Sequence, residues 1–211
     1  MIKKLKFKCL EVSDFTGFNE ILDGRVKTLH PKIHAGILNK RKNKKHLKEM
    51  KSQNFENIDL VIVNFYPFEK VLKSNSNHKN IIENIDIGGP TMVRAAAKNY
   101  NDVAVITSKF QYNELIDELV KFKGSTSQNF RQRMSQIAFT ETAYYDALIS
   151  NYFNKITHNK FPSKKIIYGN LIEKLRYGEN PHQESAIYSQ NKFLNIKQLN
   201  GKQLSYNNYN D

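Results

Sequence analysis

Two short apolar runs constrain the fold of this chain more than any other feature. Ile58–Phe65 is rich in β-branched residues, and Val103–Thr107 has the same character further along the chain. Each run has the length and composition of a strand in a parallel sheet, where both faces of the strand are buried. Helical patterns separate and follow the two runs, and this alternation is typical of a parallel sheet covered by helices. The sequence therefore predicts an α/β domain.

Helical periodicity is clearest after the second run. Ser108 and Gln111 have the spacing of a capping box, which predicts a helix beginning there. A longer helical pattern extends from about residue 127 to residue 153, and Lys40–Lys51 is a dense basic helix candidate. The residues of the long helix that we expect in the core are Phe130, Met134, Ile137, Ala138, Tyr145 and Leu148.

Charge and composition narrow the class of partner without choosing one. Lys and Arg total 33 against 20 acidic residues, giving a formal net charge of +13. This balance favours an anionic partner such as a phosphorylated small molecule, a nucleic acid or an acidic surface. The single cysteine, Cys9, excludes an intrachain disulfide, and there is neither an apolar run of membrane length nor a secretory signal pattern. We expect a cytoplasmic protein without a membrane partner.

The stretch Glu83–Asn99 has the features of an anion site with acid/base groups attached. At the end of an extended strand, Asp86 would point its carboxylate away from both of its apolar neighbours. Gly88 and Gly89 then permit a turn or the close approach of a ligand. Pro90 is suited to the first position of a helix, and such a helix start offers unpaired backbone N–H groups.

The helix that follows carries a basic face. Thr91, Arg94 and Lys98 fall at positions i, i+3 and i+7, which lie on one side of an α-helix. The alternative is an ordinary Gly-Gly-Pro turn before a helix whose basic side is solvated. These residues alone do not decide between the two.

A second polar cluster lies in Leu22–Leu38. Its polar members are Arg25, Lys27, Thr28, His30, Lys32 and His34. Arg, Lys and Thr side chains can together hold a phosphate, although a basic surface loop has the same composition. The two histidines are four residues apart, but the proline between them disturbs a helix and no Cys or acidic residue completes a ligand set. We therefore expect no metal site.

Polar groups also follow the first apolar run. Asn64 and Tyr66 come at its carboxyl end, and ligands of open α/β sheets bind beyond the carboxyl ends of the strands. The alternative for Tyr66 is a packed aromatic side chain at the strand exit.

Four motifs follow one another along the chain: Arg25–Pro31, Asn64–Phe68, Ile85–Thr91 and Arg94–Asn99. In this order they closely resemble the IMP cyclohydrolase domain of the bifunctional purine biosynthesis family. Arg176–Gln183 and Gly201–Asn208 resemble the beginning of the second domain of that family, the AICAR transformylase. The resemblance extends from Glu11 to Asp211.

The resemblance implies a doubly wound, mainly parallel sheet of the methylglyoxal-synthase-like type, followed by the start of a second α/β domain. It also implies closure of formyl-AICAR to IMP, in which the carboxamide nitrogen attacks the formyl carbon and water leaves. The catalytic residues it implies are Lys27, Tyr66, Asp86 and Lys98. The substrate-binding residues it implies are Arg25, Thr28, Asn64, Ile87, Gly88 and Gly89. No metal or cofactor is implied for this half.

We assign roles to the four catalytic residues as a hypothesis. Asp86 with Lys27 would remove the proton from nitrogen, and Lys98 with the backbone near Gly88 would stabilise the oxyanion. Tyr66 would transfer a proton to the leaving oxygen. The reaction needs one group of each kind.

Two departures from the family lead us to expect a truncated chain. The family's N-terminal βαβ-type segment, with a Ser/Lys phosphate turn and a Ser-Thr-Gly-Gly-Thr turn, is not found before Val12. The transformylase's later Lys-His pair is also absent, and Lys45-His46 lies in a different context. We expect an incomplete cyclohydrolase domain at 1–157, a linker at 158–170 and the beginning of the transformylase domain at 171–211.

The C-terminal part then carries an incomplete AICAR site and no transformylase activity. The matching residues are Arg176, Tyr177, Asn180 and Asn207. The cofactor 10-formyltetrahydrofolate is implied for the full-length transformylase only.

Three functions stay open on the sequence. The first is a working cyclohydrolase, as a homodimer or with a complementing chain. The second is an inactive nucleotide-binding fragment that needs a partner chain. The third is a basic nucleic-acid-binding module that uses Lys40–Lys51, although the usual motifs and aromatic stacking series of such modules are missing.

Overall fold

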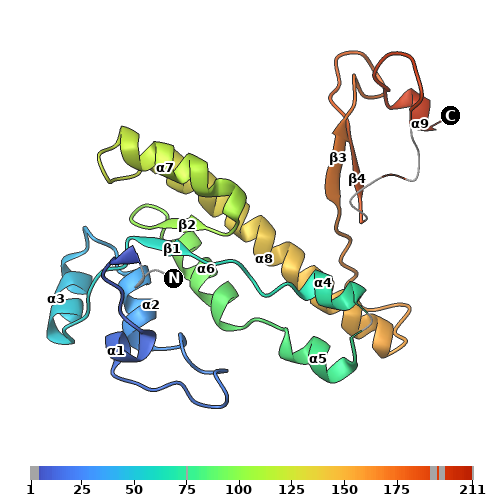
Figure 1. Ribbon diagram of the computed structural model, residues 1–211. Helices are drawn as coiled ribbons and strands as arrows, with labels where there is room; N and C mark the ends of the chain where they lie inside the picture. Colours follow the sequence, from blue (N-terminus) through green and yellow to red (C-terminus); the bar gives the residue numbers. More distant parts are fainter. Residues whose placement is uncertain (1–4, 75, 191–193, 195–197, 211) are drawn as a thin grey trace. The chain divides into compact units, whose positions relative to one another are not determined.

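The computed structural model describes residues 5–74, 76–190, 194 and 198–210 (Figure 1). The chain divides into two compact units, Met1–Ile149 and Ser150–Asp211. In the first unit, strands β1 (Leu60–Ile62) and β2 (Ala104–Ile106) pair in parallel, residue by residue. In the second unit, β3 (Asn170–Lys174) and β4 (Ala186–Ser189) form an antiparallel pair with one register irregularity.

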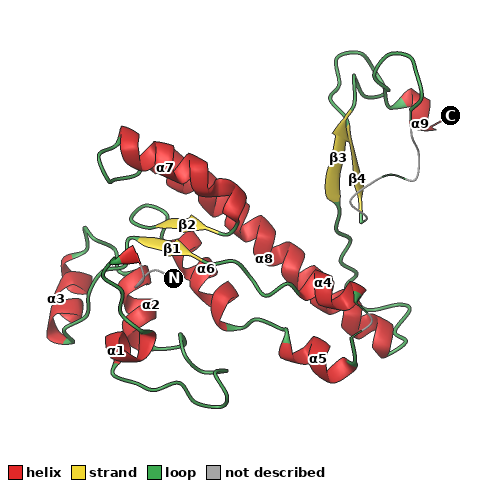
Figure 2. Ribbon diagram, viewed as in Figure 1, coloured by secondary structure: helices red, strands yellow, loops and turns green. Residues whose placement is uncertain are grey.

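Helices make up most of the remaining regular structure (Figure 2). The helical elements of the first unit are α1 (Val12–Thr16), α2 (Pro31–Leu38), α3 (Lys44–Ser52), α4 (Phe68–Lys73), α5 (His78–Glu83), α6 (Gly88–Lys98), the 3₁₀ turn η2 (Lys109–Gln111) and α7 (Tyr112–Lys121). The long helix α8 (Gln128–Ile156) begins in the first unit and ends in the second, which also contains α9 (Asn207–Asn210). Because β1 and β2 are parallel, the chain must cross over between them, and α4, α5 and α6 form that connection.

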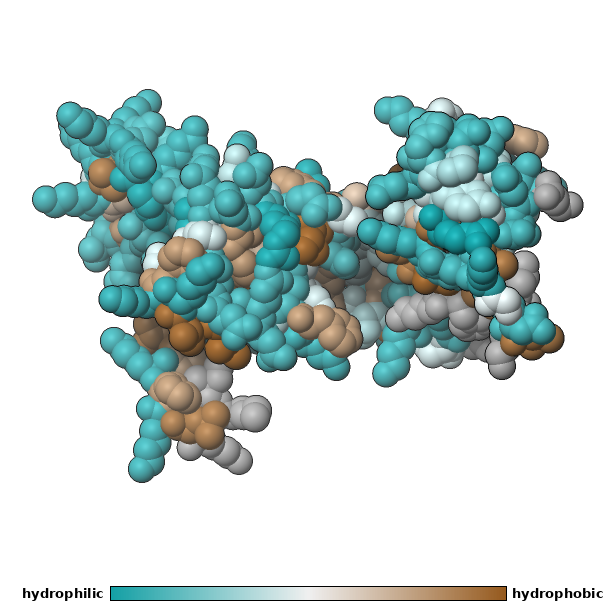
Figure 3. Space-filling view, turned by 90° about the horizontal axis from the view of Figure 1, so that it is seen from above, coloured by the Kyte–Doolittle hydropathy of each residue, from teal (hydrophilic) through white to brown (hydrophobic). Residues whose placement is uncertain are grey.

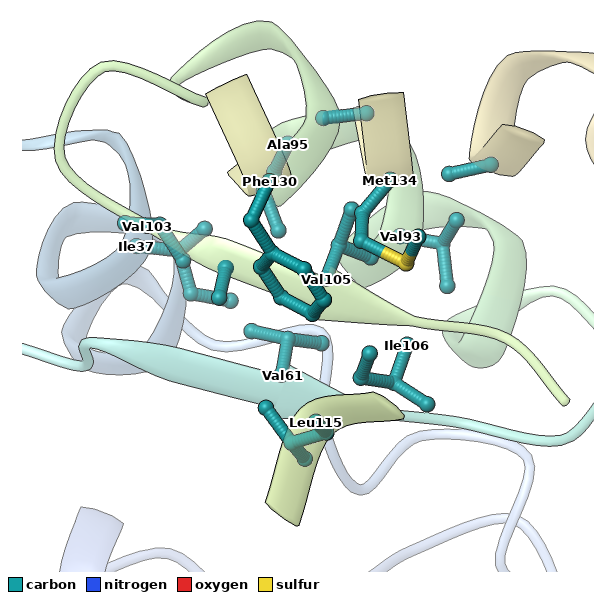
Figure 4. Packing of buried hydrophobic residues seen from close by; sticks show 14 of the residues in the cluster. Ile37, Val61, Val93, Ala95, Val103, Val105, Ile106, Leu115, Phe130 and Met134 are labelled. Atoms are coloured by element: carbon teal, nitrogen blue, oxygen red, sulfur yellow. The ribbon is translucent and has the colours of Figure 1, made fainter. Parts of the chain in front are cut away.

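The core of the first unit forms where α6 packs on both strands and α2 packs on α6. The alanines of α6 are nearly fully buried, and their small side chains let the helix backbone lie close to the sheet. Figure 4 shows Val93, Phe130 and Met134 gathered around Val105 of β2. Burial of one such Val or Phe side chain stabilises the fold by about 1.5–3 kcal/mol.

Several sequence-based predictions of local structure are confirmed. The strands form within the two apolar runs, although each is shorter than its run. Ser108 and Gln111 make the predicted capping box. The predicted long helix is α8, whose expected core residues are buried apart from Ile137, which is partly buried against the core.

Two predictions around Asp86 were wrong. The residues before Asp86 form helix α5 and a turn, where we had expected the end of a strand. Helix α6 begins at Gly88, so Pro90 is its third residue instead of its first. Proline remains compatible with that position, because the N–H groups of the first helical turn have no partner within the helix.

The face seen in Figure 3 is largely hydrophilic with small hydrophobic patches, as expected for a chain with 25% charged residues. Among the described residues, none of the helices combines the length and apolar character that a bilayer crossing requires.

Candidate active site

A cavity of about 580 Å³ lies in the first unit where β1 ends and α6 begins. Its size suits a small-molecule ligand, and its position matches the usual ligand site of open α/β sheets. Its lining residues come from the loop before α2, the segment after β1, the region from α5 to the start of α6, and Met92. They include Arg25, Lys27, Thr28, Asn64, Tyr66, Asp86, Ile87, Gly88 and Gly89.

One side of the cavity is the segment Asn84–Gly89, which we call the turn wall. Oδ1 of Asp86 accepts a hydrogen bond of 2.9 Å from the N–H of Gly89, so the carboxylate is held at the start of α6. The positive end of the helix dipole attracts negative charge at this position. Asp86 is half-buried, and it keeps its second oxygen for another partner.

The two glycines of the turn wall leave no room for a side chain. A Cβ at Gly89 would overlap Oδ2 of Asp86, and a Cβ at Gly88 would lie 2.6 Å from Oγ1 of Thr28. Glycine at these two positions therefore lets Asp86 and Thr28 lie directly against the beginning of α6.

A second side of the cavity is the segment Asp23–Thr28, which we call the loop wall. Its two cationic side chains are paired with carboxylates: Arg25 with Glu83, and Lys27 with Glu20, with 2.8 Å between Nζ of Lys27 and Oε2 of Glu20. The hydrogen bond and charge of Glu20 raise the pKa of Lys27, so the amine is protonated at neutral pH. All four side chains are largely exposed.

The loop wall begins in an unusual backbone conformation. Leu22, Asp23 and Gly24 have φ angles of 56°, 54° and 85°, and a short antiparallel bridge between Ile21 and Val26 closes the turn. Left-handed backbone costs about 1 kcal/mol or more for a residue such as leucine. The turn is thus closed by three backbone hydrogen bonds, the two between Ile21 and Val26 and one from the N–H of Arg25 to the carbonyl of Leu22, while its cations are held by exposed ion pairs.

The segment after β1 contributes the remaining polar groups. The side-chain amide of Asn64 donates a hydrogen bond of 3.2 Å to the hydroxyl of Tyr112 in α7. Tyr66 lines the cavity and is 55% exposed, so its hydroxyl is accessible to a ligand.

Lys98 is the one predicted cyclohydrolase residue that does not line this cavity. Gly88 and Lys98 are the first and last residues of α6, about 15 Å apart along the axis at 1.5 Å per residue. Lys98 is exposed, and Arg94 on the same face lies over the ring of Phe139 at 5.7 Å. A catalytic role for Lys98 stays a prediction.

His30 lies at the start of α2, and His34 lies within that helix. Pro31 is the first residue of α2, and Nδ1 of His30 accepts a hydrogen bond of 3.1 Å from the N–H of Lys32, so His30 caps the helix. Burial lowers the pKa of His34, and a hydrogen bond with the Thr28 backbone opposes that shift. Within the described residues, no cluster of His, Cys, Asp and Glu side chains is arranged to hold a metal ion.

In the second unit, the two segments that resemble the transformylase lie side by side. The N–H of Arg176 donates to the carbonyl of Leu204 at 2.9 Å, and the N–H of Tyr206 donates to the carbonyl of Tyr177 at 3.1 Å. The guanidinium of Arg176 lies 4.9 Å from the ring centre of Tyr177.

The other residues of the predicted AICAR site lie in separate local structures. A hydrogen bond with Ser205 and the charge of Arg176 lower the pKa of the Tyr177 hydroxyl. Asn207 is the first residue of α9, two residues after this serine. Asn180 lies in a turn closed by its hydrogen bonds with Gln183.

Sequence reasoning missed three residues that bond to residues lining the cavity. Glu20 and Glu83 pair with the cations of the loop wall, and no local pattern marks them. Tyr145 was predicted only as a core residue. Its hydroxyl in fact accepts a hydrogen bond of 2.8 Å from the N–H of Asp86 and donates one of 3.1 Å to the carbonyl of Asn84.

Two family models match this chain. One, described as the AICARFT/IMPCHase bienzyme, matches residues 96–211, and the other, described as an MGS-like domain, matches residues 1–91. The chain also resembles the crystal structure of ForH, with a TM-score of 0.60 and 29% identity over 72% of this chain and 79% of that one. These matches confirm the predicted methylglyoxal-synthase-like α/β fold.

Curated relatives agree with these models. The chain is 49% identical over 208 residues to the bifunctional purine biosynthesis protein PurH of Bradyrhizobium diazoefficiens, covering 97% of this chain and 39% of the relative. It is 48% identical over 200 residues to PurH of Elusimicrobium minutum, covering 94% of this chain and 39% of that protein. The chain thus spans 39% of the length of these relatives. On this evidence the chain belongs to the AICARFT/IMPCHase bienzyme family.

Proposed function

We propose that the first unit binds formyl-AICAR and closes its ring to give IMP, a step of de novo purine biosynthesis. The observation that carries this proposal is the cavity. It gathers an acid/base carboxylate, a charged lysine, a tyrosine hydroxyl and a cationic loop from separate parts of the chain. The relatives named as bifunctional purine biosynthesis proteins support the same reaction.

In this proposal Asp86 accepts the proton of the attacking carboxamide nitrogen. The carboxylate is fixed at one oxygen by the N–H of Gly89. The carboxamide nitrogen bonds to the formyl carbon, its proton passes to Asp86, and the formyl oxygen becomes a hydroxyl. Holding the base in place supplies orientation that a free carboxylate in water lacks.

The protonated side chains of Lys27 and Tyr66 act on the formyl oxygen of the substrate. Lys27 is charged, so it stabilises the developing oxyanion or supplies a proton, while Asp86 is the base of that pair. Tyr66 protonates the departing hydroxyl, which leaves as water. The formamide nitrogen loses its N–H proton to the resulting tyrosinate as the C=N bond forms, and the proton held on Asp86 returns to Lys27. Arg25 and Thr28 hold the substrate phosphate near the start of α6, and Asn64 contacts the base or ribose.

Lys98 lies at the other end of α6 from the cavity, so a catalytic role for it requires an arrangement that the cavity of a single chain does not supply. We propose that the chain works with a second copy or a complementing chain, to which Lys98 is accessible. In the described part of the first unit β1 pairs with β2 alone, which leaves outer strand edges open to association. Sedimentation of the purified chain between micromolar and nanomolar concentration tests this, and a stable monomer throughout contradicts it.

We propose no cofactor for this reaction, since a dehydrative ring closure transfers neither electrons nor a group from a carrier. We also propose a cytoplasmic location. Two further predictions remain proposals. One is the partial AICAR site, formed by Arg176, Tyr177, Asn180 and Asn207. The other is the division of the chain into a cyclohydrolase domain at 1–157, a linker at 158–170 and the beginning of the transformylase domain at 171–211. The use of 10-formyltetrahydrofolate, which we assign only to the full-length transformylase, is likewise a proposal.

The deciding experiment is an absorbance assay of IMP formation from formyl-AICAR with the purified chain and Asp86→Asn. The amide keeps an oxygen that can accept from Gly89 but is no base, so turnover should fall at least about 100-fold. The matched control is Tyr100→Phe, because Tyr100 does not line the cavity. Lys98→Ala, assayed in parallel, decides whether Lys98 takes part.

Binding measurements separate the alternatives. Binding of IMP without turnover in the wild-type chain would replace this proposal with the inactive nucleotide-binding fragment. A preference for random duplex DNA over IMP, with steep salt dependence, would instead support the nucleic-acid-binding module.

A further inference from the structure

The turn wall is tied to α8 by one side chain from far along the sequence. The Tyr145 hydroxyl holds the backbone on both sides of Ile85, accepting from the N–H of Asp86 at 2.8 Å and donating to the carbonyl of Asn84 at 3.1 Å. Only 5% of Tyr145 is exposed. A buried hydroxyl with both a donor and an acceptor partner has one preferred orientation.

The ring of Tyr145 reaches a second segment of the site. Its centre lies 5.2 Å from the ring of Phe65 and 5.9 Å from the ring of Phe68, both in tilted or edge-on contact. Tyr66 lies between these two phenylalanines in sequence and lines the cavity. Aromatic pairs of this geometry stabilise their partners' positions beyond simple burial.

We propose that Tyr145 is a positioning residue that sets the place of Asp86 relative to Tyr66. The side chain does not line the cavity and so acts through these two residues. Its hydroxyl fixes the turn from which Asp86 reaches the start of α6, and its ring fixes the segment that presents Tyr66. This inference rests on the proposed function for its catalytic consequence, while the tether itself stands independently.

The structural arm of the test is amide hydrogen exchange in the ligand-free chain. Tyr145→Phe keeps the ring and its aromatic contacts but removes both hydrogen bonds. Amides of the turn wall should then exchange about tenfold faster or more, as expected from the loss of two hydrogen bonds of about 1 kcal/mol net each. Core amides of β2 should keep their protection. The control Tyr100→Phe should leave the turn wall unchanged.

The catalytic arm is a double-mutant cycle for IMP formation. If Tyr145 acts through Asp86, Tyr145→Phe should lower kcat about tenfold in the wild-type chain, with little change in KM, and have almost no further effect beside Asp86→Asn. A merely structural role would instead produce the same loss in both backgrounds.

The two arms fail separately. If wild-type chain shows no turnover, the proposed function fails, and exchange alone decides the tether. Unchanged exchange of the turn wall in Tyr145→Phe overturns the inference whatever the turnover. Additive effects in the cycle also overturn it. If Tyr145→Phe unfolds, Phe65→Leu is assayed in its place, because it weakens the ring contact and keeps the Tyr145 hydroxyl. The inference expects a loss of kcat that nearly disappears beside Tyr66→Phe, and an equal loss in both backgrounds overturns it.

Discussion

The two walls of the cavity are built by different means. The turn wall is held from behind by a buried tyrosine and at its end by the start of a helix. The loop wall is closed by a short backbone bridge, contains left-handed residues and directs its cations into exposed ion pairs. Exposed ion pairs contribute about 0–1 kcal/mol, so the loop wall adjusts at low energetic cost.

This difference suggests that the two walls have different functions. A base must be oriented to within a fraction of an ångström to be effective, and the rigid wall carries Asp86. A phosphate can be bound by a long cationic side chain that exchanges one anionic partner for another, and the adjustable wall carries Arg25. Changes to the turn wall should therefore affect turnover, and changes to the phosphate-binding side chains of the loop wall should affect affinity.

The largest effect should follow from Gly89→Ala. The added Cβ overlaps Oδ2 of Asp86, so the carboxylate must move, whereas the helical backbone at this position accepts alanine. We expect kcat for IMP formation to fall about 100-fold or more, with an unfolding temperature near that of the wild type. Gly88→Ala meets only the side chain of Thr28, which can rotate, so its loss should be smaller. Equal activity of Gly89→Ala and wild type would contradict the rigid turn wall.

A weaker effect, on affinity, should follow from Arg25→Ala. Loss of a charge-assisted contact to phosphate should weaken IMP binding about 10- to 100-fold, measured by calorimetry at fixed salt, with kcat changed much less. A drop in kcat with unchanged affinity would reverse the roles that we give to the two walls.

The pairing of Arg25 with Glu83 predicts a smaller effect of opposite sign. Glu83 competes with an anionic ligand for the guanidinium, so Glu83→Gln should tighten IMP binding by up to about fivefold. The gain should shrink in high salt, since screening already weakens the pair. Weaker binding by Glu83→Gln would show that the carboxylate itself contacts the ligand.

The smallest effect concerns pH. Because burial lowers the pKa of His34 below its ordinary value of 6.5, the unfolded chain takes up the proton first as the pH falls. The free energy of unfolding should therefore decrease below about pH 6.5 and level off once the folded form is also protonated. Urea unfolding at pH 7.5 and 5.5 measures this change, which should be reduced in His34→Gln. An identical slope in that variant would assign the effect to other groups.

Sequence patterns correctly predicted the elements whose formation depends on neighbouring residues or on runs of apolar residues. The apolar runs became β1 and β2, and the Ser108–Gln111 spacing became a capping box because both partners lie within one turn. Expectations failed where a long-range contact decides the backbone. The turn at Asp86 is set by Tyr145, 59 residues away, and no local pattern announces that contact.

The sequence by itself determined the family, the alternation of strands and helices, and the residue types of the site, because these depend on order and spacing along the chain. Only the tertiary structure decided which of those residues meet. Asp86, Tyr66 and Lys27 line one cavity because the end of β1, the start of α6 and the loop before α2 converge there. Lys98, in the same motif as Arg94, does not line that cavity because the rise of a helix carries its last residue away from its first.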